Sequence, residues 1–352
     1  MTFKIKLSII FCIIFLQNSF SQDSIPIDKN VNYTAIPMLS FNLSKGFGVG
    51  FMAAAIYNLK KEDKVSPPSM TAMVGSYSTN KSWFGVVGQS LFLDQDNWRI
   101  EFALGHSNNN FQTFMSMPGM GDFEVPFNTK IDFVAAMGYR RVYQRLYLGA
   151  NMQLANAKTE FDLSSIDSAA NTKQNQNAFG FNAMLDTRNN IYNPSRGIHA
   201  SITTYHYLNK SENANPYTKL NFYTNYYHSI NKFNVLAARI FAKAAIGSKI
   251  PFEGLSVVGS KDLRGYSEGK YRDEQVYAIQ AEDRWNFYKK FGLVGFAGLA
   301  ITNSPKGSSS LLPAIGVGVR YKTIPSRNIN VGIDVATGKD DWGLYFRIGE
   351  AF

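Results

Sequence analysis

Apolar and polar side chains alternate with a period of two along almost the whole chain, beginning near Tyr33. In one example, Phe47, Val49 and Phe51 lie on one side of a segment whose other side carries Gly48 and Gly50. Because successive side chains of a β-strand point to opposite faces, this alternation predicts strands with one apolar face and one small or polar face. A soluble two-sheet sandwich would show the same alternation, so the period alone leaves the architecture open.

Turn-forming residues divide the alternating sequence into sixteen segments. These cover residues 33–42, 46–58, 68–79, 82–93, 96–106, 130–141, 144–157, 176–187, 197–210, 215–230, 232–246, 273–287, 290–302, 311–322, 327–337 and 341–351. A strand that crosses a bilayer needs about 9–11 residues, and most of these segments are at least that long. The expected fold class is therefore all-β, and a transmembrane barrel of sixteen antiparallel strands fits the segment lengths.

The lengths of the connections favour the membrane barrel over the sandwich. In every second position along the chain most connections are short, as at 94–95, 142–143 and 289, whereas the alternate connections include the long segments 107–129, 158–175 and 247–272. Short turns on one side and long loops on the other are typical of outer-membrane barrels with an even strand number. Aromatic residues also gather near strand ends, as interfacial belts require. They are Trp83-Phe84, Tyr226-Tyr227, Trp285, Phe287-Tyr288 and Trp342.

Composition narrows the class of protein further. Hydrophobic residues make up 45% of the 352 residues and charged residues only 18%, with a single cysteine. The hydrophobic content excludes disorder, and one cysteine excludes a disulfide scaffold or a cysteine metal site. No internal run of about 18 apolar residues exists, which excludes a helical membrane protein. The net charge of +10 is spread over turns and over expected lumen faces, as at Arg239, Lys243 and Arg347, so lipopolysaccharide and other outer-membrane lipids are the expected partners and nucleic acid is not.

The N-terminus resembles an export signal. Lys4 and Lys6 precede the apolar stretch 7–16, and small residues follow at Ser19 and Ser21. This order is typical of a cleavable secretory signal peptide; a buried N-terminal helix is the alternative, since the stretch is too short to span a bilayer. The expected organisation is a signal peptide over 1–21, a short periplasmic lead over 22–32 and the barrel over 33–352, located in the cell outer membrane.

No arrangement of residues indicates catalysis. The four histidines, at 106, 199, 206 and 228, show no spacing to each other or to carboxylates that would bind a metal. An outer-membrane phospholipase would need a Ser–His arrangement, and none can be located. The Gly46–Gly50 run alternates within a strand and opens no helix, so it is not a phosphate loop. We therefore expect no enzyme activity, no cofactor and no metal.

One loop motif does carry testable chemistry. Leu263-Arg264-Gly265-Tyr266 lies in the long connection 247–272, and the following strand carries Glu282 and Arg284 on the face expected to line the lumen. A guanidinium inside a narrow lumen must find an acceptor, and Glu282 is the best candidate. The loop would then fold into the barrel as a latch; a solvated loop arginine is the alternative.

Two further motifs lie near strand ends. Asp186 and Arg188 precede Pro194 and Gly197 in a turn expected on the periplasmic side, where Pro and Gly would fix a structural corner. The C-terminal strand carries Phe346 and Ile348 and ends at Phe352.

These three segments resemble the superfamily of the outer-membrane assembly barrel (BamA/TamA-like, bacterial surface antigen domain), to which two-partner secretion transporters also belong. The resemblance implies a sixteen-stranded barrel with the arginine loop in the lumen, between strands eleven and twelve. It also implies that the D-T-R-N-N…P-x-x-G turn joins strands eight and nine. The aromatic C-terminal strand would be the signal that the barrel assembly machinery recognises.

Two departures from the family bear on function. The family usually has an acidic residue in an F-x-D-x-G pattern on strand thirteen, where this chain has Gly298 after Phe296. The latch would then depend on Glu282 alone or on another lumen group. The family also carries periplasmic POTRA modules before the barrel, and residues 22–32 leave no room for one. A separate periplasmic protein that supplies their role is a candidate partner, and a barrel without that role is the alternative.

The resemblance implies a factor that assists insertion or translocation of outer-membrane proteins or lipids, through a weak seam between the first and last strands. Pro37 removes a ladder donor from a short first strand, and Gly343 and Gly349 interrupt the last one. The alternative is a passive channel or structural barrel without insertase activity. A lumen plugged by 247–272 would favour the first hypothesis, and an open polar pore the second.

Overall fold

The computed structural model describes residues 31–117, 121–161, 172–208, 215–259, 262–303, 309–325 and 328–352. The expected signal peptide and nearly all of the expected lead lie outside this range. Within the described part of the chain, no helix is both long and apolar enough to cross a membrane.

The described residues form nineteen strands. They are β1 (Val31–Asn42), β2 (Gly46–Tyr57), β3 (Ser69–Ser78), β4 (Trp83–Leu93), β5 (Trp98–Met117), β6 (Gly121–Tyr143), β7 (Leu146–Phe161), β8 (Thr172–Asn175), β9 (Ala178–Asp186), β10 (Gly197–Tyr207), β11 (Tyr217–Ser229), β12 (Asn234–Ile246), β13 (Ser256–Val257), β14 (Arg272–Asp273), β15 (Gln275–Tyr288), β16 (Phe291–Asn303), β17 (Ser309–Ile324), β18 (Ile329–Gly338) and β19 (Asp341–Ile348). One short 3₁₀ turn, Phe252–Gly254, precedes β13.

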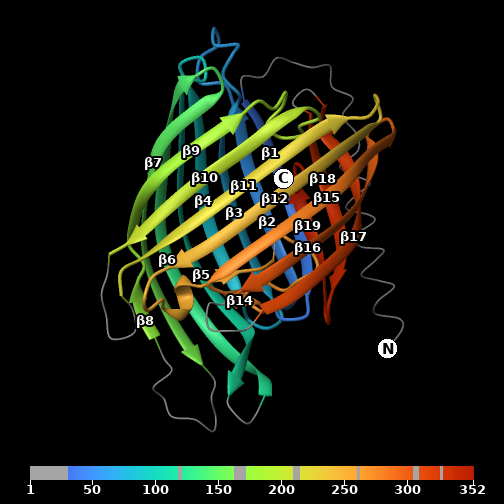
Figure 1. The fold of residues 1–352 in the computed structure, drawn as a ribbon. Helices are drawn as coiled ribbons and strands as arrows, with labels where there is room; N and C mark the ends of the chain where they lie inside the picture. Colours follow the sequence, from blue (N-terminus) through green and yellow to red (C-terminus); the bar gives the residue numbers. More distant parts are fainter. Residues whose placement is uncertain are drawn as a thin grey trace. The chain divides into compact units, whose positions relative to one another are not determined.

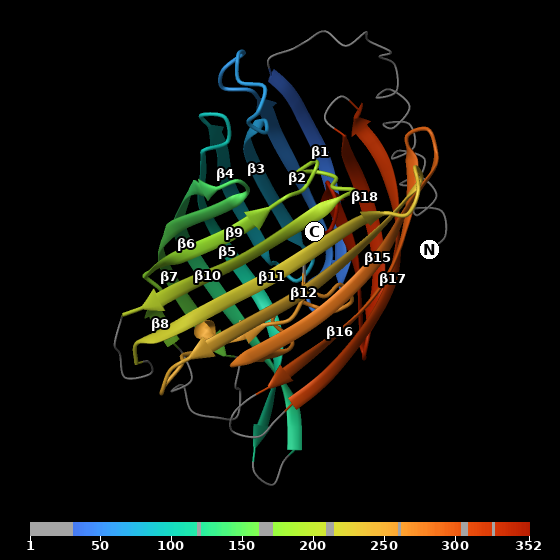
Figure 2. The same cartoon turned by 45° about the horizontal axis from the view of Figure 1, so that its top comes forward.

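Each long strand pairs antiparallel with its neighbours in the chain, and β19 pairs back onto β1, so the sheet closes into a barrel (Figures 1 and 2). Seventeen strands belong to this sheet. Of these, β8 lies in line with β9 and pairs with the C-terminal part of β7, while β9 pairs with its N-terminal part. The two therefore occupy one position in the ring, which contains sixteen strands. The sixteen-stranded antiparallel barrel expected from the sequence is confirmed. β13 and β14 form a separate two-residue pair inside the connection from β12 to β15.

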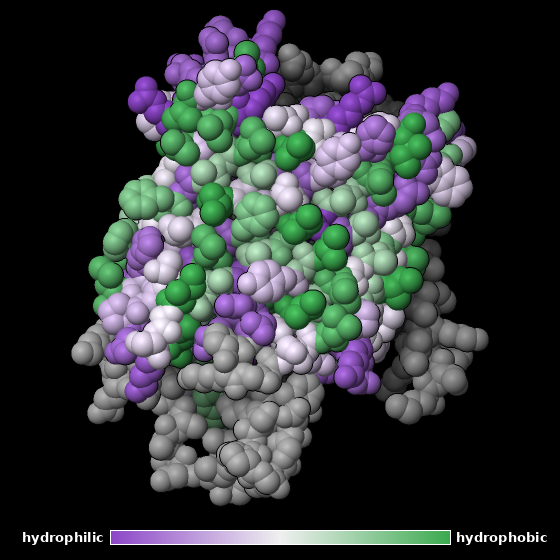
Figure 3. Space-filling model, in the orientation of Figure 1, coloured by the Kyte–Doolittle hydropathy of each residue, from purple (hydrophilic) through white to green (hydrophobic). Residues whose placement is uncertain are grey.

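The two faces of the wall follow the sequence alternation. In β7, Leu148, Met152 and Leu154 are exposed on the outside, while Asn151 and Thr159 are buried on the lumen side. Figure 3 shows hydrophobic residues gathered over the middle of the wall and hydrophilic residues at its upper rim. An apolar band between polar rims is what a lipid bilayer requires of a barrel.

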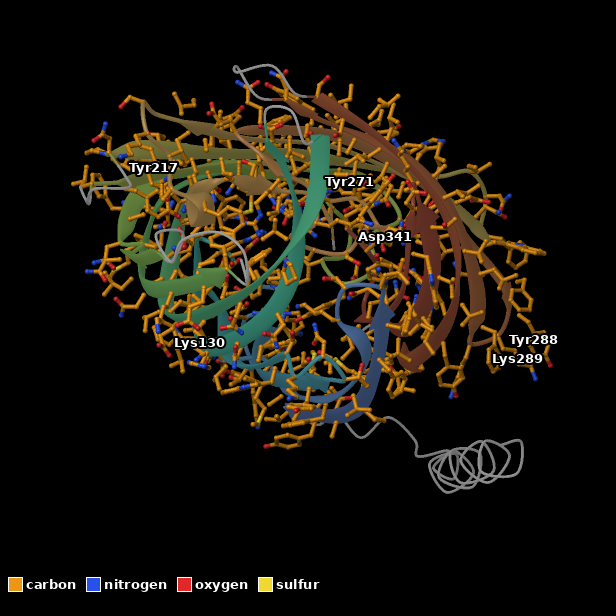
Figure 4. All side chains as sticks on the ribbon, turned by 90° about the horizontal axis from the view of Figure 1, so that it is seen from below. Lys130, Tyr217, Tyr271, Tyr288, Lys289 and Asp341 are labelled. Atoms are coloured by element: carbon orange, nitrogen blue, oxygen red, sulfur yellow. The ribbon has the colours of Figure 1, made fainter. Side chains whose placement is uncertain are left out.

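The aromatic residues at strand ends mostly face outward. Trp83, Tyr226, Trp285, Phe287, Tyr288 and Trp342 are exposed. Tyr227 is an exception, because the period of two turns it into the lumen, where it is 1% exposed. Seen along the barrel in Figure 4, Tyr288 and Lys289 lie outside the ring of strands, and Tyr271 and Asp341 lie within it.

All sixteen predicted segments occur as strands, and their ends shift by a few residues except in one hairpin. Residues 107–129, expected as a long loop, largely continue β5 and β6 as a paired hairpin in which Phe111 pairs with Phe127. The expectation of a loop was wrong because Asn108, Asn109 and Asn110 are polar on both faces. Backbone pairing continues there without an apolar face. Likewise β7 extends to Phe161, into the expected loop 158–175.

The connections sort to two ends. One end, here called the turn end, carries the short β4–β5, β6–β7, β11–β12 and β15–β16 turns. The other, the loop end, carries the β5–β6 hairpin and the long β12–β15 connection. In Figure 1 the turn end is uppermost. This is the asymmetry predicted from the sequence, although two turn-end connections, 58–68 and 187–196, are longer than the rest.

Candidate functional site: the lumen latch and the seam

The arginine loop lies inside the barrel. Arg264 is fully buried, with 0% exposure. Its guanidinium donates to Glu282 Oε2 at 2.5 Å and to Asp334 Oδ2 at 2.7 Å, and its Nε donates to Gln280 Oε1 at 3.2 Å. The ring of Phe296 covers it, with 3.4 Å between the guanidinium carbon and the ring centroid. The contact expected between Arg264 and Glu282 is therefore present, and each nitrogen of the guanidinium has an acceptor.

The second acid comes from a strand that the sequence did not point to. Asp334 lies on β18, is buried with 0% exposure, and accepts from Arg264 and also from Arg320 at 2.5 Å. The latch thus rests on two carboxylates, and Asp334 is the other lumen group that the sequence left unnamed. A single aspartate on an alternating strand gives no sequence signal by itself, because its partner lies 70 residues away.

The presence of glycine at position 298 has a steric explanation in this chain. A Cβ at Gly298 would lie 2.6 Å from Leu263 Cδ1 and 2.8 Å from the carbonyl oxygen of Ile279. Leu263 is itself fully buried. The space that a longer residue at 298 would need is therefore filled by the leucine that precedes Arg264, and the acid is supplied from β18 instead.

Glycine and tyrosine fix the approach of the loop to the wall. Gly265 has φ +107°, and a Cβ there would lie 2.9 Å from the Thr337 carbonyl group, so only glycine fits without strain. Its N–H donates to Tyr345 Oη at 2.9 Å. Tyr266 donates its hydroxyl to the Pro313 carbonyl at 2.5 Å and accepts from the Lys339 N–H at 2.9 Å. The four motif residues thus contact β15 to β19.

The barrel closes through a very short seam. Over their described lengths, β1 and β19 pair at two positions, Phe41 with Leu344 and Asn42 with Gly343. By contrast, β1 pairs with β2 at twelve positions and β18 with β19 at eight. The closed part lies at the loop end, where the Phe41 and Trp342 rings stack with centroids 4.3 Å apart.

The arginine loop also bridges this seam, a contact that the sequence analysis missed. Ser267 is 1% exposed, and its N–H donates to Asp341 Oδ2 at 2.8 Å. Its hydroxyl lies 3.1 Å from Asp341 Oδ1 and 3.4 Å from Asn42 Oδ1, and it accepts from the Ser44 N–H at 3.4 Å. Because Asp341 begins β19 and Asn42 ends β1, one loop residue connects both strands of the seam.

The turn-end motif forms a buried ion cluster at the start of its connection. Asp186 is 2% exposed and accepts from Arg188 Nε at 2.8 Å and from Arg99 Nη1 at 2.6 Å. Arg99 also pairs with Asp96 at 2.8 Å, and its guanidinium lies 4.3 Å from the centre of the Tyr147 ring. Arg99 was not singled out from the sequence. The expected structural corner thus has a second arginine.

The rest of that connection crosses the turn-end mouth. Gly197 has φ +108°, and a Cβ there would lie 2.3 Å from the Thr187 carbonyl oxygen. The crossing segment, residues 189–195, contacts widely separated parts of the barrel. Tyr192 donates to the Pro68 carbonyl, Ser229 donates to that of Ser195, Asn328 to that of Asn193 and Arg284 to that of Pro194, all between 3.1 and 3.3 Å.

The C-terminal residues leave the wall. Phe346 and Ile348 belong to β19, but Gly349 adopts φ +76° and the chain then turns inward. The Phe352 carbonyl accepts from Arg284 Nη2 at 2.9 Å, and the Phe352 ring lies 5.7 Å from that guanidinium. The last aromatic residue therefore faces the lumen, whereas continued alternation would have placed it on the lipid side.

Arg284 joins the three sequence motifs. It donates to Glu282 Oε1 at 2.7 Å, to the carbonyl of Pro194 in the crossing segment and to the carbonyl of Phe352. The latch, the turn-end connection and the C-terminal residues are thus in contact through one buried side chain.

A closed antiparallel barrel with an apolar outer band, a polar lumen and a loop folded inside defines a membrane β-barrel of the outer-membrane type. The sequence model of the Omp85 superfamily domain matches residues 76–352. The chain belongs to the Omp85 superfamily, a family of transport and assembly barrels. None of the curated proteins matches the chain.

Solved structures show the same fold. BamA from Haemophilus ducreyi lacking POTRA domains 1–3 is similar with a TM-score of 0.58 and 12% identity, over 91% of this chain and 70% of that chain. CdiB from Acinetobacter baumannii has a TM-score of 0.58 and 12% identity, over 91% of this chain and 60% of that chain. CdiB from Escherichia coli has a TM-score of 0.58 and 10% identity, over 91% of this chain and 63% of that chain. The chain thus spans less than two thirds of the CdiB structures, and identities this low show likeness of fold.

Proposed function

We propose that this chain assists the insertion or translocation of proteins across the outer membrane by opening the seam between β1 and β19. The observation that carries the proposal is the seam itself, which pairs at two positions while its flanking strand pairs have twelve and eight. Unpaired backbone groups in hydrocarbon cost several kcal/mol each. The free edges of β1 and β19 would therefore favour pairing with an incoming strand.

The position of the arginine loop supports this function over a passive channel. Arg264 and Tyr266 are buried among lumen-facing groups of β15 to β19, so the loop fills part of the lumen. Ser267 connects the loop to both strands of the seam. A loop that touches both seam strands is placed to respond when they separate, which a simple pore does not need.

The partners follow from the same proposal. The chain would reside in the outer membrane, in contact with phospholipid and lipopolysaccharide, and the barrel assembly machinery would insert it there. A separate periplasmic protein would deliver the substrate to the turn end, where the crossing segment covers part of the mouth.

A disulfide lock tests whether opening is required. Phe41→Cys with Leu344→Cys would cross-link the paired end of the seam. Val335→Cys with Leu344→Cys is the matched control, because it cross-links β19 to β18 at another antiparallel pair. The only native cysteine, Cys12, lies in the expected signal peptide, so neither lock competes with a barrel thiol.

We expect the seam lock to abolish rescue of the envelope defect of a deletion strain, and reductant to restore it. The control lock should rescue the deletion strain both with and without reductant. Full rescue by the oxidised seam lock would contradict the proposal and favour the passive barrel, which would then show a steady conductance in planar bilayers.

A further inference from the structure

A cavity of about 490 Å³ lies in the lumen between the wall of β10 to β12 and the inward-turned end of the chain. Arg239 and His199 line one side, and Arg347 and Glu350 line the other. Arg188 and Ile191 of the turn-end connection also line it. Glu350 is the only acidic residue among the described residues that line this cavity.

Arginine side chains predominate among the charged residues that line the cavity. On the β15–β19 side, four arginines share three carboxylates: they are Arg264, Arg284, Arg320 and Arg347 with Glu282, Asp334 and Glu350. On the opposite side, Arg239 and Lys243 share Asp262, at 3.4 and 2.7 Å. Of these groups, Arg239, Arg347 and Glu350 line the cavity itself, together with Arg188.

Two arginines of the cavity also have N–H groups without acceptors. Arg239 is 8% exposed, and its Nε–H has no hydrogen-bond partner among the described residues. Its Nη1 donates only to the neutral Asn225. Arg347 Nε forms an ion pair with Asp334 Oδ2 at 2.8 Å, but the two are not aligned as a hydrogen bond, so its N–H also has no hydrogen-bond acceptor among the described residues. Leaving a buried donor unpaired costs roughly 1–3 kcal/mol.

We propose that this cavity binds a phosphate-bearing ligand. Water could satisfy the two donors, but an anion would also be attracted by the three arginines that line the cavity. Guanidinium groups pair with phosphate in a bidentate manner. The volume exceeds that of inorganic phosphate, so the phosphate would carry an organic substituent. This site does not depend on seam opening.

The ligand could come from solution or from a membrane lipid. Phe346 and Ile348, in the part of β19 that does not pair with β1, also line the cavity. A lipid headgroup could therefore enter beside the open part of the seam, and a soluble phosphate ester could enter from the turn end. Both present the same phosphate group to Arg239 and Arg347.

Binding to the purified full chain in neutral detergent tests the site. The probes are inorganic phosphate, glycerophosphoglycerol and phosphatidylglycerol, with calorimetry for the soluble probes and native mass spectrometry for the lipid. We expect saturable binding that Arg239→Gln weakens at least tenfold. Arg196→Gln, which changes an exposed arginine, is the matched control and should bind as the unchanged chain does.

The outcomes are distinguishable. Binding of the lipid alone assigns the site to a headgroup, and equal binding of glycerophosphoglycerol assigns it to a soluble ester. If Arg239→Gln does not fold, Arg239→Lys keeps the charge but loses the Nε donor, and it should bind with intermediate affinity. No saturable binding of any probe, or equal binding by the unchanged chain and the Arg239 variant, would overturn the proposal.

Discussion

Arg264 is the residue on which the lumen side of the account depends. Both of its carboxylate partners keep other arginines when it is removed: Glu282 retains Arg284, and Asp334 retains Arg320. Removing one partner of a buried ion pair typically costs about 3–5 kcal/mol. The remaining arginines should hold the loss here to the low end of that range.

We therefore predict that Arg264→Ala lowers the unfolding temperature of the barrel and frees the loop, while Arg264→Lys has an intermediate effect because it keeps charge without the planar fork. Heat-dependent mobility on gels and proteolysis of residues 247–272 would measure both effects. If Arg264→Ala leaves barrel stability, loop protection and envelope phenotype unchanged, the loop is not a latch.

The sequence could indicate Arg264 and Glu282, because the loop motif and the next strand are close in the chain. It could not indicate Asp334 or Ser267 as their partners. Those contacts depend on how strands far apart in the sequence are brought together by closure of the barrel. Arg99 at the turn end was missed for the same reason, since Asp186 is 87 residues away.

At the scale of elements, Ser267 and the two seam strands form one unit. Replacing Ser267 by Ala removes the hydroxyl shared between Asp341 and Asn42 but keeps the N–H bond to Asp341. A net loss of about 1 kcal/mol is typical of one hydrogen bond.

Ser267→Ala should therefore raise the fraction of molecules with an open seam by roughly fivefold. Spin-label distances across the seam measure this fraction. Ser201→Ala, which changes a buried serine on β10, is the control and should leave it unchanged. If the open fraction is unchanged in Ser267→Ala, the Ser267 hydroxyl does not help to hold the seam closed.

The β2–β3 connection at the turn end is held by a second local contact. Asp63 accepts from the Ser66 N–H at 2.9 Å and the Ser66 hydroxyl at 2.7 Å, and from the Gln95 N–H at 2.9 Å. These donors, chiefly Ser66, lower the pKa of Asp63 from 3.8 to about 2. The same connection carries Pro68, to which Tyr192 of the crossing segment donates.

Because the folded state lowers this pKa, the ionised carboxylate stabilises the connection above about pH 4 and loses that effect as the pH falls toward 2. We predict that Asp63→Asn weakens amide protection of the 58–68 connection at pH 6 and removes its acid dependence between pH 4 and 2. Hydrogen exchange of peptides from 58–68 measures this, with Glu62→Gln as the neighbouring control. Equal acid dependence in Asp63→Asn would show that another group is responsible.

The strands themselves were predictable because each has its own alternation of apolar and polar residues. The extension of β5 and β6 into a long hairpin was not predictable from the sequence, because strands outside lipid need no apolar face. The inward turn at Gly349 was also not predictable from the sequence, because a glycine at this position is compatible with a continued strand as well as with a positive φ.

The whole barrel is closed by long strand pairings except at one seam. Fifteen of the sixteen neighbouring strand pairs of the ring have long registers, and the sixteenth has two paired positions. Strand count and loop asymmetry could be derived from the sequence. The register at which the ring closes could not, because it depends on the sum of all strand offsets and not on any one segment.

Beyond their two paired positions, β1 and β19 separate. Leu39 and Phe346 would be opposite each other if the seam pairing continued, whereas Ile333 and Phe346 are opposite across the paired β18–β19 ladder. Spin labels at each pair, measured by double electron–electron resonance in lipid nanodiscs, compare the two directly. We predict a longer and broader distance distribution for Leu39–Phe346 than for Ile333–Phe346. Two equally short and narrow distributions would show that β1 and β19 remain paired along their length, which would contradict a weak seam.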